Sequence, residues 1–71
     1  MNKVTFTQWP TYRGSTPVGY MVRVTCGHGV HEFETLGPVN VGQVCRMLNQ
    51  RLADLGYTFD DYRPRDFEVR S

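Results

Sequence analysis

The chain has 71 residues, of which 39% are hydrophobic and 13% aromatic, and its formal net charge is +1 with neutral histidines. This content excludes a disordered polar tail. The near-neutral charge argues against non-specific nucleic-acid binding, which depends on an excess of positive charge. The length suits one domain, placed at residues 1–71, and a domain of this size buries only roughly 60% of the surface its unfolded chain exposes.

Neither a membrane segment nor a secretion signal is visible in the sequence. No apolar run approaches the roughly 20 residues that span a bilayer, and residues 1–8 lack the basic and apolar regions of a signal peptide. We therefore expect a cytoplasmic protein, in which Cys26 and Cys45 are reduced thiols.

Residues 3–9 alternate between polar side chains and apolar ones such as Val4 and Phe6, which predicts a strand. Pro10 should end this strand, because proline has no N–H to donate to a neighbouring strand. The stretch 10–17 begins and ends in proline and contains a glycine and a serine, so we predict a surface loop there.

A second strand is predicted over residues 18–26, and a third follows the Gly-His-Gly turn directly after it. A two-residue loop at Gly27–His28 pairs Arg23 with Glu32, whereas a loop shifted by one residue pairs Arg23 with Glu34. Both registers place opposite charges across the strand pair, which stabilises it by about 0.2–1 kcal/mol. The hairpin is therefore predicted, and its register stays open.

A helix is predicted after Gly37 and Pro38. Asn40 caps its start, Gln43 completes a capping box, and Gly56 supplies the left-handed residue that ends it. One face carries an apolar stripe typical of a helix packed on a core, formed by Val41, Val44, Cys45, Leu48, Leu52 and Leu55. The opposite face is expected to be solvated and carries Gln43, Arg46, Gln50, Arg51 and Asp54.

After the helix, residues 57–64 are predicted to form a polar loop and residues 66–70 a short closing strand. The element order is β-β-β-α-β. The predicted fold class is therefore α+β: a small, mainly antiparallel sheet with one helix packed on one face. The other sheet face is expected to meet water or a partner.

Cysteine and histidine provide the only candidates for a metal site, and they are weak ones. Two cysteines and two histidines can complete a tetrahedral zinc site, but their spacing is not that of a zinc finger, and one cysteine belongs to the helix stripe. The four residues are Cys26, His28, His31 and Cys45. We expect no metal and no cofactor.

The same side chains are also the only candidates for nucleophilic catalysis, since a thiol needs a base within hydrogen-bond reach. The sequence has no serine nucleophile motif and no glycine loop that cradles phosphate. A domain this small has little room for a pocket of the ~300 Å³ typical of ligand sites. We therefore predict no enzymatic activity and no catalytic residue.

Aromatic and arginine side chains in the two predicted loops are the candidates for binding a partner. Tryptophan, tyrosine and arginine are the residue types enriched at binding hot spots. The candidates are Trp9, Tyr12, Arg13, Tyr62, Arg63 and Arg65.

The sequence hypothesis is a small non-enzymatic protein-binding module or inhibitor that occludes a site on a larger protein or nucleoprotein complex. Its size and lack of catalytic motifs are typical of phage and mobile-element accessory proteins, of which the anti-CRISPR inhibitors are one class.

The alternative is a nucleic-acid-binding domain that uses the sheet face or the arginine-bearing loops. Direct nucleic-acid binding is disfavoured because Glu32 and Glu34 lie on the expected open face beside Thr5, Thr7, Met21 and Arg23. A third hypothesis is a homodimer formed through an uncovered edge strand.

Overall fold

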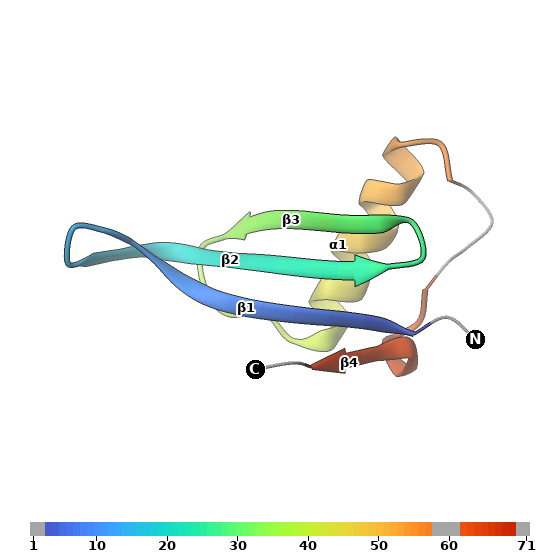
Figure 1. Ribbon diagram of the computed structural model, residues 1–71, viewed down its shortest axis with the longest axis horizontal. Coiled ribbons are helices and arrows are strands. Elements are labelled where there is room, and N and C mark those ends of the chain that lie inside the picture. Colours follow the sequence, from blue (N-terminus) through green and yellow to red (C-terminus); the bar gives the residue numbers. More distant parts are fainter. Residues whose placement is uncertain (1–2, 58–61, 70–71) are drawn as a thin grey trace.

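The computed structural model describes residues 3–57 and 62–69 as a four-stranded sheet with one helix on one face (Figure 1). The strand order is β3-β2-β1-β4, with β4 parallel to β1 and the other pairs antiparallel. This confirms the predicted small α+β fold. The elements are β1 (Val4–Arg13), β2 (Thr16–Cys26), β3 (Gly29–Thr35), α1 (Val41–Asp54), a 3-10 turn (Pro64–Asp66) and β4 (Phe67–Val69).

The register left open by the sequence is the one with its loop at Gly27–His28. Arg23 lies opposite Glu32, and its Nε donates to Oε2 of that glutamate at 2.8 Å. Gly29 has a φ of +101°, a conformation that costs glycine little and other residues much more. Glycine at this position is therefore compatible with the observed loop, whose register is given by the pairing itself.

The predicted surface loop at residues 10–17 is wrong, because β1 continues through Pro10 to Arg13 and β2 begins at Thr16. Within the described residues β4 pairs with β1 only as far as Phe6, so Pro10 lies on a stretch of β1 with one neighbouring strand. Proline is tolerated on such an edge stretch, because the side without a neighbour requires no donor.

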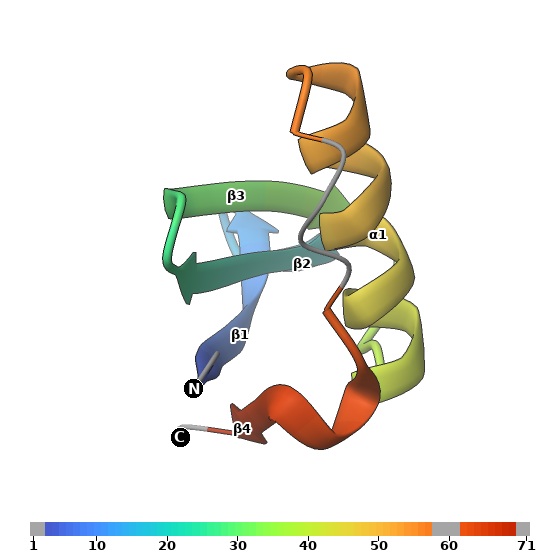
Figure 2. The same ribbon diagram turned by 90° about the vertical axis from the view of Figure 1, so that its right-hand side faces the viewer.

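The core lies between the sheet and α1. The stripe prediction is confirmed for the middle of the helix, but it is wrong for Leu55, which is 57% exposed. The reason is visible in Figure 2, where the C-terminal turn of α1 extends past the edge strand β3 and has no sheet beneath it. The buried residues are Val4, Phe6, Val22, Val24, Val44, Cys45, Leu48, Leu52 and Tyr62.

Both ends of α1 follow the sequence prediction. Asn40 Oδ1 accepts from the backbone N–H of Gln43 at 2.9 Å, and Gln43 Oε1 accepts from the backbone N–H of Asn40 at 2.9 Å. At the other end Gly56 has a φ of +95°, and the Tyr57 N–H turns back to donate to the Leu52 carbonyl at 2.8 Å. These bonds satisfy backbone groups that a helix end otherwise leaves unpaired.

The predicted closing strand exists as β4, in which Phe67 lies opposite Val4 and Val69 opposite Phe6. Residue 70, included in the prediction, lies outside the described residues, as do residues 58–61 of the predicted polar loop. The parallel pairing of β4 places its chain beside the start of β1, at the end of the sheet that α1 covers (Figure 1).

Candidate functional site

A projecting hairpin is the most distinctive surface feature of the molecule. The pairing of β2 with β3 ends at Tyr20 and Thr35, whereas β1 and β2 continue to their turn at Gly14–Ser15 as a two-stranded ribbon (Figure 1). No other described element pairs with this ribbon, and α1 crosses the opposite end of the sheet. We call residues 11–19 the finger.

The finger exposes aromatic and apolar side chains. Tyr12 is 59% exposed and Val18 52% exposed, and Arg13 is exposed beside them. An irregularity in strand pairing between Thr11 and Tyr12 acts as a β-bulge, a device that redirects side chains next to binding sites. Gly14 closes the turn with a φ of +65°.

A hollow of about 250 Å³ joins the base of the finger to the end of β3. Leu36, on its rim, is 97% exposed. Gly19 permits the close approach of the two segments, since a Cβ at this position would lie 2.6 Å from the backbone oxygen of Thr35. The lining residues are Thr11, Val18, Gly19, Tyr20, Glu34, Thr35 and Leu36.

Leu36 was not among the sequence candidates. Its signal in the sequence is an apolar residue placed directly before the Gly-Pro pair that ends β3, where no strand or helix periodicity accounts for it. We name the four exposed side chains at this end of the molecule the finger surface: Tyr12, Arg13, Val18 and Leu36.

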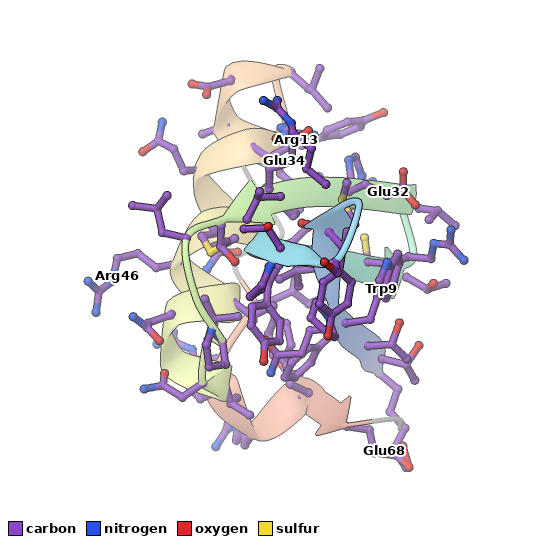
Figure 3. The ribbon with its side chains drawn as sticks, turned by 90° about the vertical axis from the view of Figure 1, so that its left-hand side faces the viewer. Trp9, Arg13, Glu32, Glu34, Arg46 and Glu68 are labelled. Atoms are coloured by element: carbon purple, nitrogen blue, oxygen red, sulfur yellow. The ribbon has the colours of Figure 1, made fainter. Side chains whose placement is uncertain are left out.

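Trp9 lies on the face of the sheet away from α1, where Figure 3 also shows Glu32 and Glu68. It is partly buried and lies opposite Met21 on β2. The guanidinium of Arg23 lies 5.2 Å from the centroid of the indole ring, within the range of a cation–π contact. Trp9 is therefore held by the Arg23 contact near the base of the finger, with only part of its surface exposed.

The open sheet face carries paired charges of both signs. Lys3 Nζ lies 3.1 Å from Glu68 Oε2, and Arg23 Nε lies 2.8 Å from Glu32 Oε2. Exposed pairs of this kind contribute only about 0–1 kcal/mol to stability, but they leave the face without a positive excess. The expected electrostatic footprint of a phosphate-binding sheet is therefore not found among the described residues of this face.

The expectation that Tyr62 is an exposed contact is wrong, because this residue is only 5% exposed. Its hydroxyl accepts from the Gly27 N–H at 3.3 Å. Its backbone N–H donates to Asn49 Oδ1 at 2.9 Å, and its carbonyl accepts from Asn49 Nδ2 at 2.9 Å and from the Cys45 thiol at 3.1 Å. Tyr62 therefore anchors the tail to the helix and cannot serve as a surface contact in this conformation.

Arg63 and Arg65 are exposed at the 3-10 turn and line a shallow depression with Pro64. The 3-10 turn lies beside the start of β1, whereas the finger forms the opposite end of the molecule (Figure 1). The structure therefore separates the six partner-binding candidates and does not bring these two arginines into the finger surface.

Three of the four weak metal candidates, Cys26, His28 and Cys45, have other contacts, whereas the buried His31 Nε2 has no hydrogen-bond partner among the described residues. The His28 ring lies 4.2 Å from the Tyr57 ring, centroid to centroid, and Cys26 Sγ accepts from the His28 backbone N–H at 3.4 Å. Neither cysteine forms a disulfide with another described residue. Residues 3–57 and 62–69 contain no group of three or more histidine, cysteine or acidic side chains arranged to hold a metal ion.

No protein-family model matches this chain, and neither a curated protein nor a solved structure is significantly similar to it. None of the helices formed by the described residues has both the length and the hydropathy needed to cross a bilayer. Because no relative indicates a function, the proposed function rests on the surfaces of the molecule described above.

Proposed function

We propose that this protein is a small non-enzymatic binding module that inhibits a larger protein or nucleoprotein complex by inserting its finger surface into a functional site. The observation that carries the proposal is the exposure of Tyr12, Val18 and Leu36 around one projecting element. Leu36 is 97% exposed, so it contributes nothing to the core and is free to be buried by a partner. Apolar surface removed from water stabilises a complex by roughly 25 cal/mol per Å².

The backbone of the finger also suits insertion into a cleft. The two strands of the finger are already paired with each other, since Tyr12 lies opposite Pro17 and Thr11 lies opposite Gly19. Binding therefore need not order a free loop. A pre-ordered element loses less conformational entropy on association. Tyr12 offers a rigid aromatic side chain. Arg13 adds a planar fork of donors for a carboxylate or phosphate on the partner.

The cellular setting we propose is a phage or mobile-element accessory protein of the anti-defence kind, similar in role to anti-CRISPR proteins. Its support is the lack of a catalytic motif in these residues beside an exposed apolar finger surface. Expression of the chain should restore plaque formation by a phage that the CRISPR system of the host otherwise targets. Unchanged protection of the host would contradict this setting and leave the finger proposal to its own test.

The finger is tested with Tyr12→Ala and Leu36→Ser, and Leu55→Ser serves as the matched control. Leu55 is 57% exposed but belongs to the end of α1, far from the finger (Figure 1). Immobilised wild-type protein captures the partner from lysate of the native host, and calorimetry with the purified partner measures the dissociation constant of each variant.

Each finger variant should raise the dissociation constant by about tenfold or more, the effect of losing roughly 1.4 kcal/mol. The control should bind like wild type, and all three variants should keep the wild-type urea midpoint. Wild-type affinity in both finger variants would refute the assignment. Affinity for an oligonucleotide that falls steeply with salt would favour the nucleic-acid alternative.

A further inference from the structure

The edge of β3 is a second surface, separate from the finger. β3 is the terminal strand of the sheet and pairs only with β2 among the described elements. Its outer edge therefore presents backbone N–H and C=O groups that no described strand satisfies, which is the surface that another strand can extend.

α1 already covers the place beside β3 where an additional strand would lie. In Figure 2 the C-terminal part of α1 extends beyond β3, while the sheet ends at this strand. Adjacent strands lie about 4.8 Å apart, so a strand added to β3 would lie beneath the projecting part of the helix. It would be covered on one face like the other strands of the sheet.

A groove of about 540 Å³ lies between β3 and α1 at this edge. Phe33, Val39 and Met47 give it apolar walls, and the Arg51 guanidinium carbon lies 4.4 Å from the centroid of the Phe33 ring. The helix face predicted to be only solvated thus borders a partly apolar groove. Its helix residues are Gln43, Arg46, Met47, Gln50, Arg51 and Asp54.

The charges at this edge differ between the two faces of the sheet. On the groove side, Arg46 and Arg51 have no ion pair within the described residues, and the Asp54 carboxylate already accepts from Gln50 at 3.0 Å. On the open side, Glu34 is exposed and forms no ion pair with a described residue. The groove therefore favours an acidic side chain, and the open face favours a basic one.

A second copy of this chain does not satisfy these charges. Two fully overlapping β3 strands, related by a two-fold axis at Glu32, would place this glutamate opposite its own copy. A shift of the axis to Phe33 would place Glu32 opposite Glu34 of the other copy. Like charges directly opposite each other destabilise a strand pair, so the edge favours a different occupant.

We infer that β3 accepts an extended segment of another protein as a fifth strand. Along this segment, apolar and acidic side chains enter the groove beside Phe33 and Arg51, and basic side chains alternate with them over the open face near Glu34. Backbone hydrogen bonds to β3 supply affinity, and the alternating side chains supply specificity. This surface does not depend on the finger.

The probe is a blocked synthetic peptide with the same length as β3, which has seven residues. Its sequence is Thr-Ile-Lys-Ile-Lys-Glu-Thr. A charge-swapped peptide, Thr-Ile-Glu-Ile-Glu-Lys-Thr, is the matched control. NMR titration of the isotope-labelled full chain locates the binding site and measures affinity, and amide hydrogen exchange reports new backbone hydrogen bonds along β3.

We expect the first peptide to slow exchange at alternate β3 amides and to shift the resonances of Phe33 and Arg51. The charge-swapped peptide and the Arg51→Gln variant should each weaken binding about two- to fivefold, the effect of losing an exposed ion pair. No β3 protection at millimolar peptide, or resonance shifts confined to the finger, would overturn the inference. So would a dimer of the free chain in sedimentation with the same β3 amides already protected.

Discussion

Replacement of Asn49 by alanine should destabilise the fold strongly, although this side chain belongs neither to the apolar stripe nor to the proposed binding surfaces. Asn49 is the polar link between α1 and the tail, because its amide bonds both backbone groups of Tyr62. Without it, the partly buried Tyr62 N–H loses its bond to the Asn49 oxygen, while the carbonyl keeps its bond from the Cys45 thiol.

The size of the effect follows from these contacts. An unsatisfied buried N–H costs about 1–3 kcal/mol, and the lost bond to the carbonyl, which keeps another donor, costs about 0.5–1.5 kcal/mol. Alanine returns roughly 0.5 kcal/mol through its better helix propensity. The expected loss in free energy of unfolding is therefore about 1–4 kcal/mol, a large share of the stability of a domain this small.

Urea denaturation followed by far-UV circular dichroism measures this loss, and the melting temperature should fall by at least about 4 °C. The matched control is Gln50→Ala, which removes an exposed helix hydrogen bond to Asp54 and should change stability by less than about 0.5 kcal/mol. If Asn49→Ala unfolds at the same urea concentration as this control, the tail is not held to the helix as described.

The remaining predictions use the same urea titration. Leu48→Ala should cost about 2–5 kcal/mol, because this fully buried side chain leaves a cavity, whereas Leu55→Ala at an exposed position should cost less than about 1 kcal/mol; equal costs would mean that the core is misplaced. Gly19→Ala should destabilise by at least about 1 kcal/mol, because the new Cβ would meet the Thr35 oxygen, and a neutral result would show that β3 does not approach this closely. Asn40→Ala should cost about 0.5–2 kcal/mol through the lost cap, and an unchanged midpoint would argue against the capping box.

Local chemistry made the helix and the central hairpin predictable. The cap pair Asn40 and Gln43 and the terminal Gly56 act within a few residues of the helix ends, so their roles are readable from spacing alone. The hairpin register was not readable in this way, because both registers oppose Arg23 to a glutamate. Only the three-dimensional pairing distinguishes them.

The errors arose where a residue depends on distant parts of the chain. Pro10 was expected to end β1, but proline is tolerated where a strand has a neighbour on one side only. Whether β1 has a second neighbour at Pro10 depends on how far β4 pairs along it. Tyr62 appeared to be exposed because its neighbours in sequence are polar. It is buried by contacts with Asn49 and Gly27, which lie 13 and 35 residues away.

The same limitation applies to the candidate surfaces. The aromatic and arginine content of the loop predicted at residues 10–17 pointed to Tyr12 and Arg13, which the structure places on the finger. Leu36 and the groove beside Phe33 could not be found from residue type, because both arise from where β3 ends relative to β2 and α1. Exposure of an apolar side chain becomes informative only when the neighbouring elements are known.

Photocrosslinking from the finger tests the central claim most directly. Tyr12 is replaced by the photoreactive residue p-benzoylphenylalanine, which keeps an aromatic ring at the position, and exposed Ala53 on α1 is replaced in the same way as the control. On irradiation in cells of the native host, the residue at position 12 should give one covalent adduct with a larger protein, and the residue at position 53 should not crosslink to that protein. No adduct from position 12, together with an adduct from position 53, would contradict the claim that the finger is the binding surface.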